Sequence, residues 1–214
     1  MPAYHPDPEV LMDYASGALP EPVALLVATH ASLCRDCQGE IARLEALGGA
    51  LFDALDAAPL EEGALDRTLL RLEDPASDKG VAETGDPRVP RPLRGYLGST
   101  LDSLAWKSRG SGSIAEVDLL AGHPGIRTRL LRIRGGTAVP RHSHEGNELT
   151  LVLAGGFSDA SGHYLKGDVA VADPSVDHRP VADAGADCLC LAVTDAPLRL
   201  TGRFGRYLNA FLRL

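Results

Sequence analysis

The 214-residue sequence predicts a two-domain α+β protein, with a small all-α helical bundle followed by an all-β barrel or sandwich. Apolar residues recur at helical spacing from Pro8 to about Leu72, whereas short apolar segments separated by Gly, Pro and Asp follow further along the chain. Between these regions, residues 73–92 contain almost no large apolar side chain and are rich in Pro, Gly and charge, which is typical of a linker. We therefore expect a first domain over 1–85, a second over 93–200, and a tail over 201–214.

Four short helices are predicted in the N-terminal domain. Each has apolar residues at the 3.6-residue spacing of a helix with one buried face. Pro8 precedes the first helix, and Gly17 marks its end. The expected ranges are 8–17, 21–30, 37–55 and 61–72. Because four short helices bury only a small core, a structural metal ion would help to stabilise this domain.

Short strands separated by turn residues are predicted in the second domain. Their regular spacing is typical of an all-β sandwich or barrel, and we find no internal repeat. The expected strands cover 114–121, 127–134, 148–154, 168–172, 188–193 and a further segment at 198–201. The apolar end of the chain, residues 207–214, is expected either to pair at a sheet edge or to form a final helical turn.

The negative charge of the chain is concentrated in the N-terminal domain. The net charge is −8, but residues 1–85 contain 16 Asp or Glu against 5 Lys or Arg, whereas residues 86–214 contain 13 against 16. An acidic surface repels a phosphate backbone and attracts a basic protein. We therefore expect a protein partner and no direct nucleic-acid binding, which also argues against a zinc-finger DNA-binding protein.

The compartment is predicted to be the cytoplasm. No apolar run approaches the ~20 residues that span a bilayer, and residues 1–7 lack the basic and then apolar order of a signal peptide. The four cysteines form two close pairs, Cys34/Cys37 and Cys188/Cys190, rather than a disulfide framework. In a reducing compartment such pairs indicate metal or redox chemistry. We expect a soluble protein without membrane association.

The first candidate metal site consists of His5, His30, Cys34 and Cys37. If the second helix continues to about residue 38, the last three lie at i, i+4 and i+7 on one helix face. His5 could then complete the tetrahedral nitrogen and sulfur shell that structural zinc prefers. The alternative is that the two cysteines are ordinary small buried residues and that His30 is a surface histidine.

The second candidate metal site consists of His142, His144, Glu148 and His178. His142 and His144 are two residues apart, so an extended strand places both imidazoles on one face. Glu148 opens the next apolar run after a Gly-Asn turn signal, and His178 follows a further strand. Three imidazoles and one carboxylate suit Zn, Fe, Mn, Ni or Cu. The alternative is that two of the histidines are solvated loop residues and that Glu148 is a charged strand end.

Three weaker features also have predicted positions. Cys188 and Cys190 share one face of a strand, either as small buried residues or as a thiol pair near the second metal site. His123 and His163 are expected in solvent. The basic alternation is expected on the outer face of strands, and it consists of Arg127, Arg129, Arg132 and Arg134.

The second site resembles the metal-binding motifs of the cupin family. The spacing Gly136-x5-His142-x-His144-x3-Glu148-x6-Gly155 is similar to the first cupin motif at every position. The second cupin motif is met in part, by Gly167, Pro174 and His178. The resemblance implies an all-β cupin barrel that encloses the metal ion.

The first site, with a histidine near the start of the chain, resembles the zinc-binding anti-sigma domain of bacteria. The two modules in this order, joined by a linker, resemble the ChrR-type anti-sigma factors over nearly the whole chain. The resemblance implies zinc on His5, His30, Cys34 and Cys37 and a second zinc on the cupin residues. It also implies that the helices hold an extracytoplasmic-function-type sigma factor away from core RNA polymerase. The cupin domain would permit release under oxidative stress caused by singlet oxygen, with a protease as a further partner.

Two classes of function therefore remain open. The first is a non-enzymatic regulator of transcription, with one zinc ion in each domain. The second is a cupin metalloenzyme, a dioxygenase or isomerase, because such a metal site with an open coordination position can also support catalysis. The sequence offers no obvious general base beside that site, which leaves Glu145, His163 and Tyr164 as the residues to consider. Iron or manganese in the second site would favour the enzyme.

Overall fold

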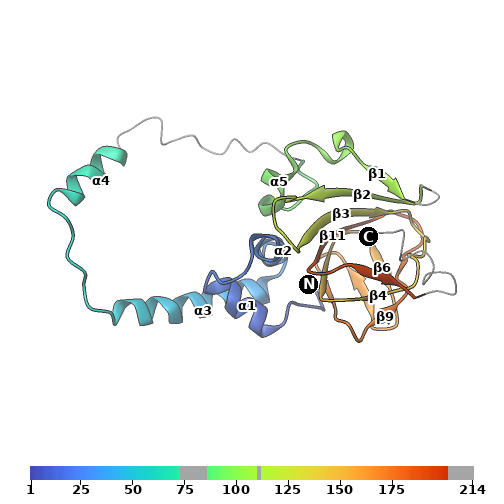
Figure 1. Ribbon diagram of the computed structural model, residues 1–214, viewed down its shortest axis with the longest axis horizontal. Helices are drawn as coiled ribbons and strands as arrows, with labels where there is room; N and C mark the ends of the chain where they lie inside the picture. The colour runs from blue at the N-terminus through green and yellow to red at the C-terminus, as the bar shows by residue number, and fades with distance from the viewer. Residues whose placement is uncertain (73–85, 110–111, 202–214) are drawn as a thin grey trace.

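The computed structural model describes residues 1–72, 86–109 and 112–201. It contains a helical N-terminal region and a β-rich region that follows it, as the fold class predicts (Figure 1). The predicted tail segment 207–214 lies outside the described residues, as do residues 73–85 of the predicted linker. No helix in the described part of the chain has the length and apolarity required to cross a bilayer.

The helices of the N-terminal region are close to the predicted ranges, except where the second one ends. They are α1 (Pro8–Ala15), α2 (Glu21–Ala31), α3 (Arg35–Asp53) and α4 (Ala64–Leu72). The sequence allowed α2 to continue to about residue 38, but it ends at Ala31, and Ser32 is its C-cap. Cys34 is the N-cap of α3 in an extended conformation. The chain therefore bends between the second and third predicted zinc ligands.

The helical core is formed by three helices rather than the predicted four. Leu11 of α1, Val27 of α2 and Ile41 of α3 pack together with the two cysteines of the first candidate site. The second half of α3 and the whole of α4 contribute no buried residue to this core. Figure 1 shows both segments extending away from the β domain. Their apolar residues have the expected helical periodicity, but they face solvent.

The β strands form three antiparallel sheets. The large sheet has the order β1-β2-β3-β11-β5-β8, and the small sheets have the orders β10-β6-β7 and β12-β4-β9. In the described residues these sheets are not joined into one closed barrel. The bounds are β1 Lys107–Arg109, β2 Ile114–Leu119, β3 Arg127–Ile133, β4 His142–His144, β5 Glu148–Ala154, β6 Gly156–Ser158, β7 His163–Leu165, β8 Val169–Ala172, β9 Asp177–His178, β10 Val181–Ala182, β11 Cys188–Thr194 and β12 Leu198–Leu200.

The large sheet has one face toward an internal cavity and the other toward the helices. Cys190 on β11 lines the cavity, whereas its neighbours Leu189 and Leu191 pack on the opposite face. That outer face is covered by Leu26 of α2, which is completely buried there. The helical region and the β domain therefore share one hydrophobic core, although the sequence presents them as separate domains.

The alternation of side chains between the two faces of the large sheet corrects the prediction for the basic residues of β3. Arg127 and Arg129 are an even number of positions from Leu131, so all three share one face of the strand. Arg129 is buried and lines the cavity with Leu131. Arg132 has the opposite parity, and its guanidinium lies 4.5 Å from the ring centroid of Trp106. An odd number of positions along the strand separates Arg129 from Arg132, so the two side chains lie on opposite faces. Only part of the predicted outer basic face is therefore external.

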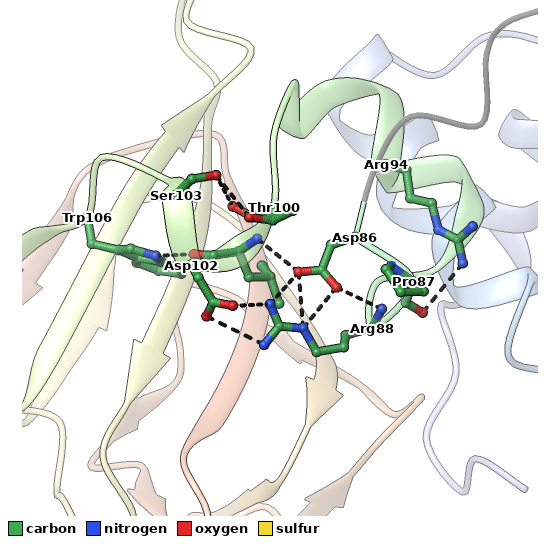
Figure 2. Close-up of polar contacts among 9 residues, drawn as sticks. Asp86, Pro87, Arg88, Arg94, Thr100, Asp102, Ser103 and Trp106 are labelled. Atoms are coloured by element: carbon green, nitrogen blue, oxygen red, sulfur yellow. Dashed lines mark hydrogen bonds and ion pairs between the residues drawn. The ribbon is translucent and has the colours of Figure 1, made fainter.

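Part of the predicted linker is packed structure. Asp86 and Val89 are buried, and α5 (Arg91–Leu97) begins within the segment assigned to the linker. Figure 2 shows the Asp86 carboxylate beside the Arg88 guanidinium. The same carboxylate accepts from the backbone N–H of Leu101 at 3.0 Å, at the start of the short 3-10 helix η1 (Leu101–Ser103). The Arg88 side chain holds the pKa of Asp86 well below its usual range. These contacts fix the entry of the chain into the β domain.

Candidate metal centres

The four predicted donors of the first site converge between α2, α3 and the N-terminal segment. Nδ1 of His5 lies 3.4 Å from Sγ of both Cys34 and Cys37, and Nε2 of His30 lies 3.2 Å from Sγ of Cys37. All four donor atoms are within 4.8 Å of one another. Nitrogen and sulfur ligands of one tetrahedral zinc ion are roughly 3.6 Å apart, given the usual bond lengths. The residues present therefore fit a structural zinc ion.

The bend between α2 and α3 explains how these donors meet. His30 lies in the last turn of α2, Cys34 caps α3, and Cys37 lies one turn further along α3. The structure brings the four predicted residues together, but the predicted single helix face is wrong. Two helix ends and the N-terminal segment meet at the donors, so one ion there would connect three separate parts of the chain.

The first site is also in contact with the β domain. Nδ1 of His30 donates to the carbonyl oxygen of Gly167 at 2.7 Å, which leaves Nε2 free to bind a metal ion. Gly167 has φ of +97°, and a Cβ atom there would lie 2.8 Å from Cγ of Pro2. Burial lowers the pKa of His30, which favours the neutral imidazole that metal binding requires.

The three predicted histidines of the second site meet at the edge of the cavity. His142 of β4 pairs in register with His178 of β9, and all three imidazoles are buried. Nε2 of His178 lies 3.1 Å from Nε2 of His142 and 3.2 Å from Nε2 of His144. Ligand nitrogens on one zinc ion are about 3.3 Å apart for tetrahedral geometry. Burial lowers the pKa of His142 and His144, so the cluster fits a divalent metal ion.

Outer contacts orient two of these imidazoles. Nδ1 of His142 donates to the carbonyl oxygen of Pro140 at 2.8 Å. Nδ1 of His178 lies 2.6 Å from the buried carboxylate of Asp159, which sequence analysis did not identify. Both contacts direct Nε2 toward the centre of the cluster. The only sequence signal for Asp159 is its position in a Ser-Gly turn, which gives no indication of a metal centre.

Glu148 lies on the wall of the same cavity but outside the group of converging donors. The structure groups His142, His144 and His178, whereas Oε1 of Glu148 accepts a hydrogen bond from the Thr150 hydroxyl at 3.1 Å. The role of Glu148 as a fourth ligand stays a prediction.

Of the three candidate general bases of the enzyme hypothesis, only Tyr164 lines the cavity with His142 and His178. Glu145 and His163 are exposed and form ion pairs with Arg199 and Asp183, respectively. Tyr164 is buried and stacks on Phe157, with ring centroids 4.9 Å apart. His123, expected in solvent, contacts Glu21 at 3.0 Å and has 31% of its side chain exposed.

Cys188 and Cys190 occupy the same face of β11, as predicted. Both thiols are buried, and their sulfur atoms lie 3.5 Å apart. The hydrogen bond with Cys188 and burial raise the pKa of Cys190 well above its ordinary value. Their position among core residues agrees with the interpretation as small buried side chains.

Comparison with known proteins places these centres in a family. Residues 97–197 match the family described as the ChrR cupin-like domain. Over 211 residues the chain is 40% identical to the anti-sigma-E factor ChrR of Cereibacter sphaeroides, which covers 99% of this chain and 98% of that protein. The chain belongs to the ChrR family of anti-sigma factors. The resemblance found in the sequence is thereby confirmed.

A solved structure supports this membership over both parts of the ChrR-family chain. The structure of Rhodobacter sphaeroides SigE in complex with the anti-sigma ChrR has a TM-score of 0.80 and 39% sequence identity. The match covers 91% of this chain and 99% of that one. The β region is therefore a cupin-like domain, and membership of an anti-sigma family confirms the predicted regulator rather than the metalloenzyme.

Proposed function

We propose that this chain binds an extracytoplasmic-function-type sigma factor through its N-terminal helices and thereby keeps it from core RNA polymerase in the cytoplasm. The observation that carries the proposal is an uncovered apolar surface on α3, α4 and the segment between them. Its members are Leu47, Leu51, Phe52, Leu55, Leu60, Leu65, Leu69, Leu70 and Leu72, which are between 49% and 83% exposed. An apolar surface of this kind marks a protein interface.

The arrangement of this surface fits a partner that packs between helices. Leu47 and Leu51 lie one turn apart on α3, and Leu65, Leu69 and Leu72 share one face of α4. The surface belongs to the acidic N-terminal region, where residues 1–85 contain 16 Asp or Glu and only 5 Lys or Arg. A sigma factor has basic surfaces for DNA, so the acidic charge favours the encounter.

We assign zinc to both metal centres of this regulator. Two thiols and two imidazoles that are close enough to bind one ion tetrahedrally are typical of structural zinc. In the cupin-like domain, His142, His144 and His178 would hold the ion, with Glu148 as the fourth ligand. The first ion would stabilise a helical region with a small core, whereas the second belongs to the domain that we propose as the sensor of oxidative stress, with singlet oxygen as the signal.

Direct contacts between the two parts support a regulatory role for the cupin-like domain. The Asp168 carboxylate accepts hydrogen bonds from the backbone N–H groups of Ala3 and Tyr4, at 2.6 and 3.1 Å. The Tyr4 ring lies 4.5 Å from the Tyr164 ring, measured between centroids. Tyr4 adjoins the ligand His5, so a rearrangement of the cupin-like domain would reach the first metal centre through these contacts.

Inhibition of transcription tests the proposed function. The purified protein, mixed with the sigma factor that copurifies with it and with core polymerase, should abolish sigma-dependent transcription. The double variant Leu51→Asp/Phe52→Asp should bind the sigma factor about tenfold more weakly or worse, because it places two charges in the apolar surface. Leu165→Asp is the matched control, since Leu165 is 49% exposed on β7 in the cupin-like domain. Unchanged transcription at saturating wild-type protein would refute the proposal.

A further inference from the structure

The cupin-like domain contains a cavity of about 350 Å³ beside its histidine cluster. The large sheet forms one side, and residues from the two small sheets form the other. Most of the wall is apolar, with contributions from Ile114, Leu131, Ile133, Val139 and Phe157. This volume lies within the range of small-molecule sites, which are mostly apolar with a few placed polar groups.

An incompletely paired arginine lies in the wall of this cavity. Arg129 is only 6% exposed, and its Nε–H has no hydrogen-bond partner among the described residues. Its ion pair with Glu116 is long, with 3.6 Å between Nη1 and Oε2. Burial lowers the pKa of Arg129, because it disfavours the charged guanidinium. A buried guanidinium normally has a close carboxylate and satisfied donors.

The carboxylate nearest to Arg129 is already shared. Glu116 is buried and accepts from Arg109 at 2.5 Å and from Arg127 at 3.2 Å, both shorter than its contact with Arg129. Asp118 pairs with Arg127 at 3.0 Å and also with Lys107 at 3.1 Å. Four basic side chains therefore share two carboxylates along β1, β2 and β3.

Glu148 also faces Arg129 and offsets part of its charge. If Glu148 binds the ion of the second metal centre, its carboxylate cancels one of the two positive charges of a divalent ion, and the neutral imidazoles cancel none. The centre would then have a net charge of about +1. The guanidinium and the metal centre would then both present positive charge to the same apolar cavity. An additional anion between them would be strongly stabilised in this environment of low dielectric constant.

We propose that this cavity binds a small organic carboxylate with an apolar body. The carboxylate accepts from the guanidinium of Arg129, and the apolar body packs on the walls around Leu131, Ile133 and Phe157. The binding of this ligand does not depend on the proposed inhibition of a sigma factor.

Calorimetric titration of the zinc-loaded full-length protein tests this site. Hexanoate should bind, whereas hexan-1-ol and acetate, which lack the charge and the apolar body respectively, should each bind about tenfold more weakly or worse. Arg129→Gln should weaken hexanoate binding about tenfold or more. Arg132→Gln on the same strand is the control and should leave binding unchanged, because Arg132 lies over Trp106 rather than in the cavity.

A second variant keeps the test decisive if Arg129→Gln does not fold. Ala170→Leu adds volume to the cavity wall and should weaken octanoate more than butyrate. Absence of hexanoate binding to the wild-type protein would show that only water occupies the cavity and would overturn the proposal. Equal binding of hexanoate by wild type and a folded Arg129→Gln variant would also overturn it. None of these measurements involves a sigma factor, so failure here leaves the proposed inhibition intact.

Discussion

At the scale of single residues, the two metal centres depend on groups that do not bind the metal. The ligand His30 is oriented by the Gly167 carbonyl, and His178 is oriented by Asp159. Such outer partners fix the tautomer of an imidazole and raise its basicity. The two groups of converging donors were predictable because their spacing is a local property of the sequence. Asp159 and Arg129 were not, because their roles depend on which strands the fold brings together.

Asp159→Asn should weaken metal binding at the cupin-like centre by about 10- to 100-fold, because the neutral amide lacks the negative charge that strengthens the hydrogen bond from Nδ1–H of His178. Competition with a chromogenic chelator should show one of two zinc equivalents leaving at a lower chelator concentration. The control is Asp183→Asn, which alters an exposed carboxylate paired with the non-ligand His163 at 2.8 Å. An equal effect of both variants would contradict the role of Asp159.

At the scale of elements, the long helices and strands were predictable, as was the short strand β12, but most strands of two or three residues were not. The range of β5 agrees with the prediction, because alternation and apolar content are clear over 148–154. Strands of two or three residues, such as β9 and β10, are too short to show any periodicity. The helix α5 lies in a stretch rich in Pro and Gly, but Leu93 and Leu97 bury one face in the shared core. Tertiary packing there outweighs local propensity.

The end of α2 also depends on tertiary structure. The segment Ser32-Leu33-Cys34 has neither Gly nor Pro, so the sequence contains no strong helix-stop signal there. The bend brings Cys34 and Cys37 toward His5 and His30. Metal binding can therefore contribute free energy to the joint between α2 and α3, which local propensity alone does not fix.

Removing the thiol ligands should loosen the three-helix core. Cys34→Ala/Cys37→Ala should lose one zinc equivalent per chain and raise hydrogen exchange in α1 and α3, since Leu11, Val27 and Ile41 form only a small core. Cys188→Ala/Cys190→Ala removes the same number of thiols from β11 and should retain both zinc equivalents. Metal analysis and hydrogen-exchange mass spectrometry make the comparison. Retention of the zinc by the first variant would exclude the proposed ligands.

At the scale of the whole molecule, α2 belongs to both parts of the structure. Val27 packs in the helical core with Cys34 and Cys37, whereas Leu25 and Leu26 pack on the outer face of the large sheet. Tyr96 of α5 donates to Glu21 at the start of α2 at 3.0 Å. The sequence could not reveal this arrangement, because a helix buried on two sides shows only a weak amphipathic pattern. The two regions should therefore unfold together.

Leu26→Ala tests this shared core. Leu26 is fully buried, so the substitution should cost about 2–5 kcal/mol of unfolding free energy through lost burial and a residual cavity. The fluorescence of Trp106, in the cupin-like domain, and the helical circular dichroism should shift to the same lower denaturation midpoint. Leu51→Ala is the control, because Leu51 is 66% exposed on α3, and it should change stability by at most ~0.5 kcal/mol. Two separate transitions, with only the helical signal shifted in Leu26→Ala, would mean that the helices and the β domain fold independently.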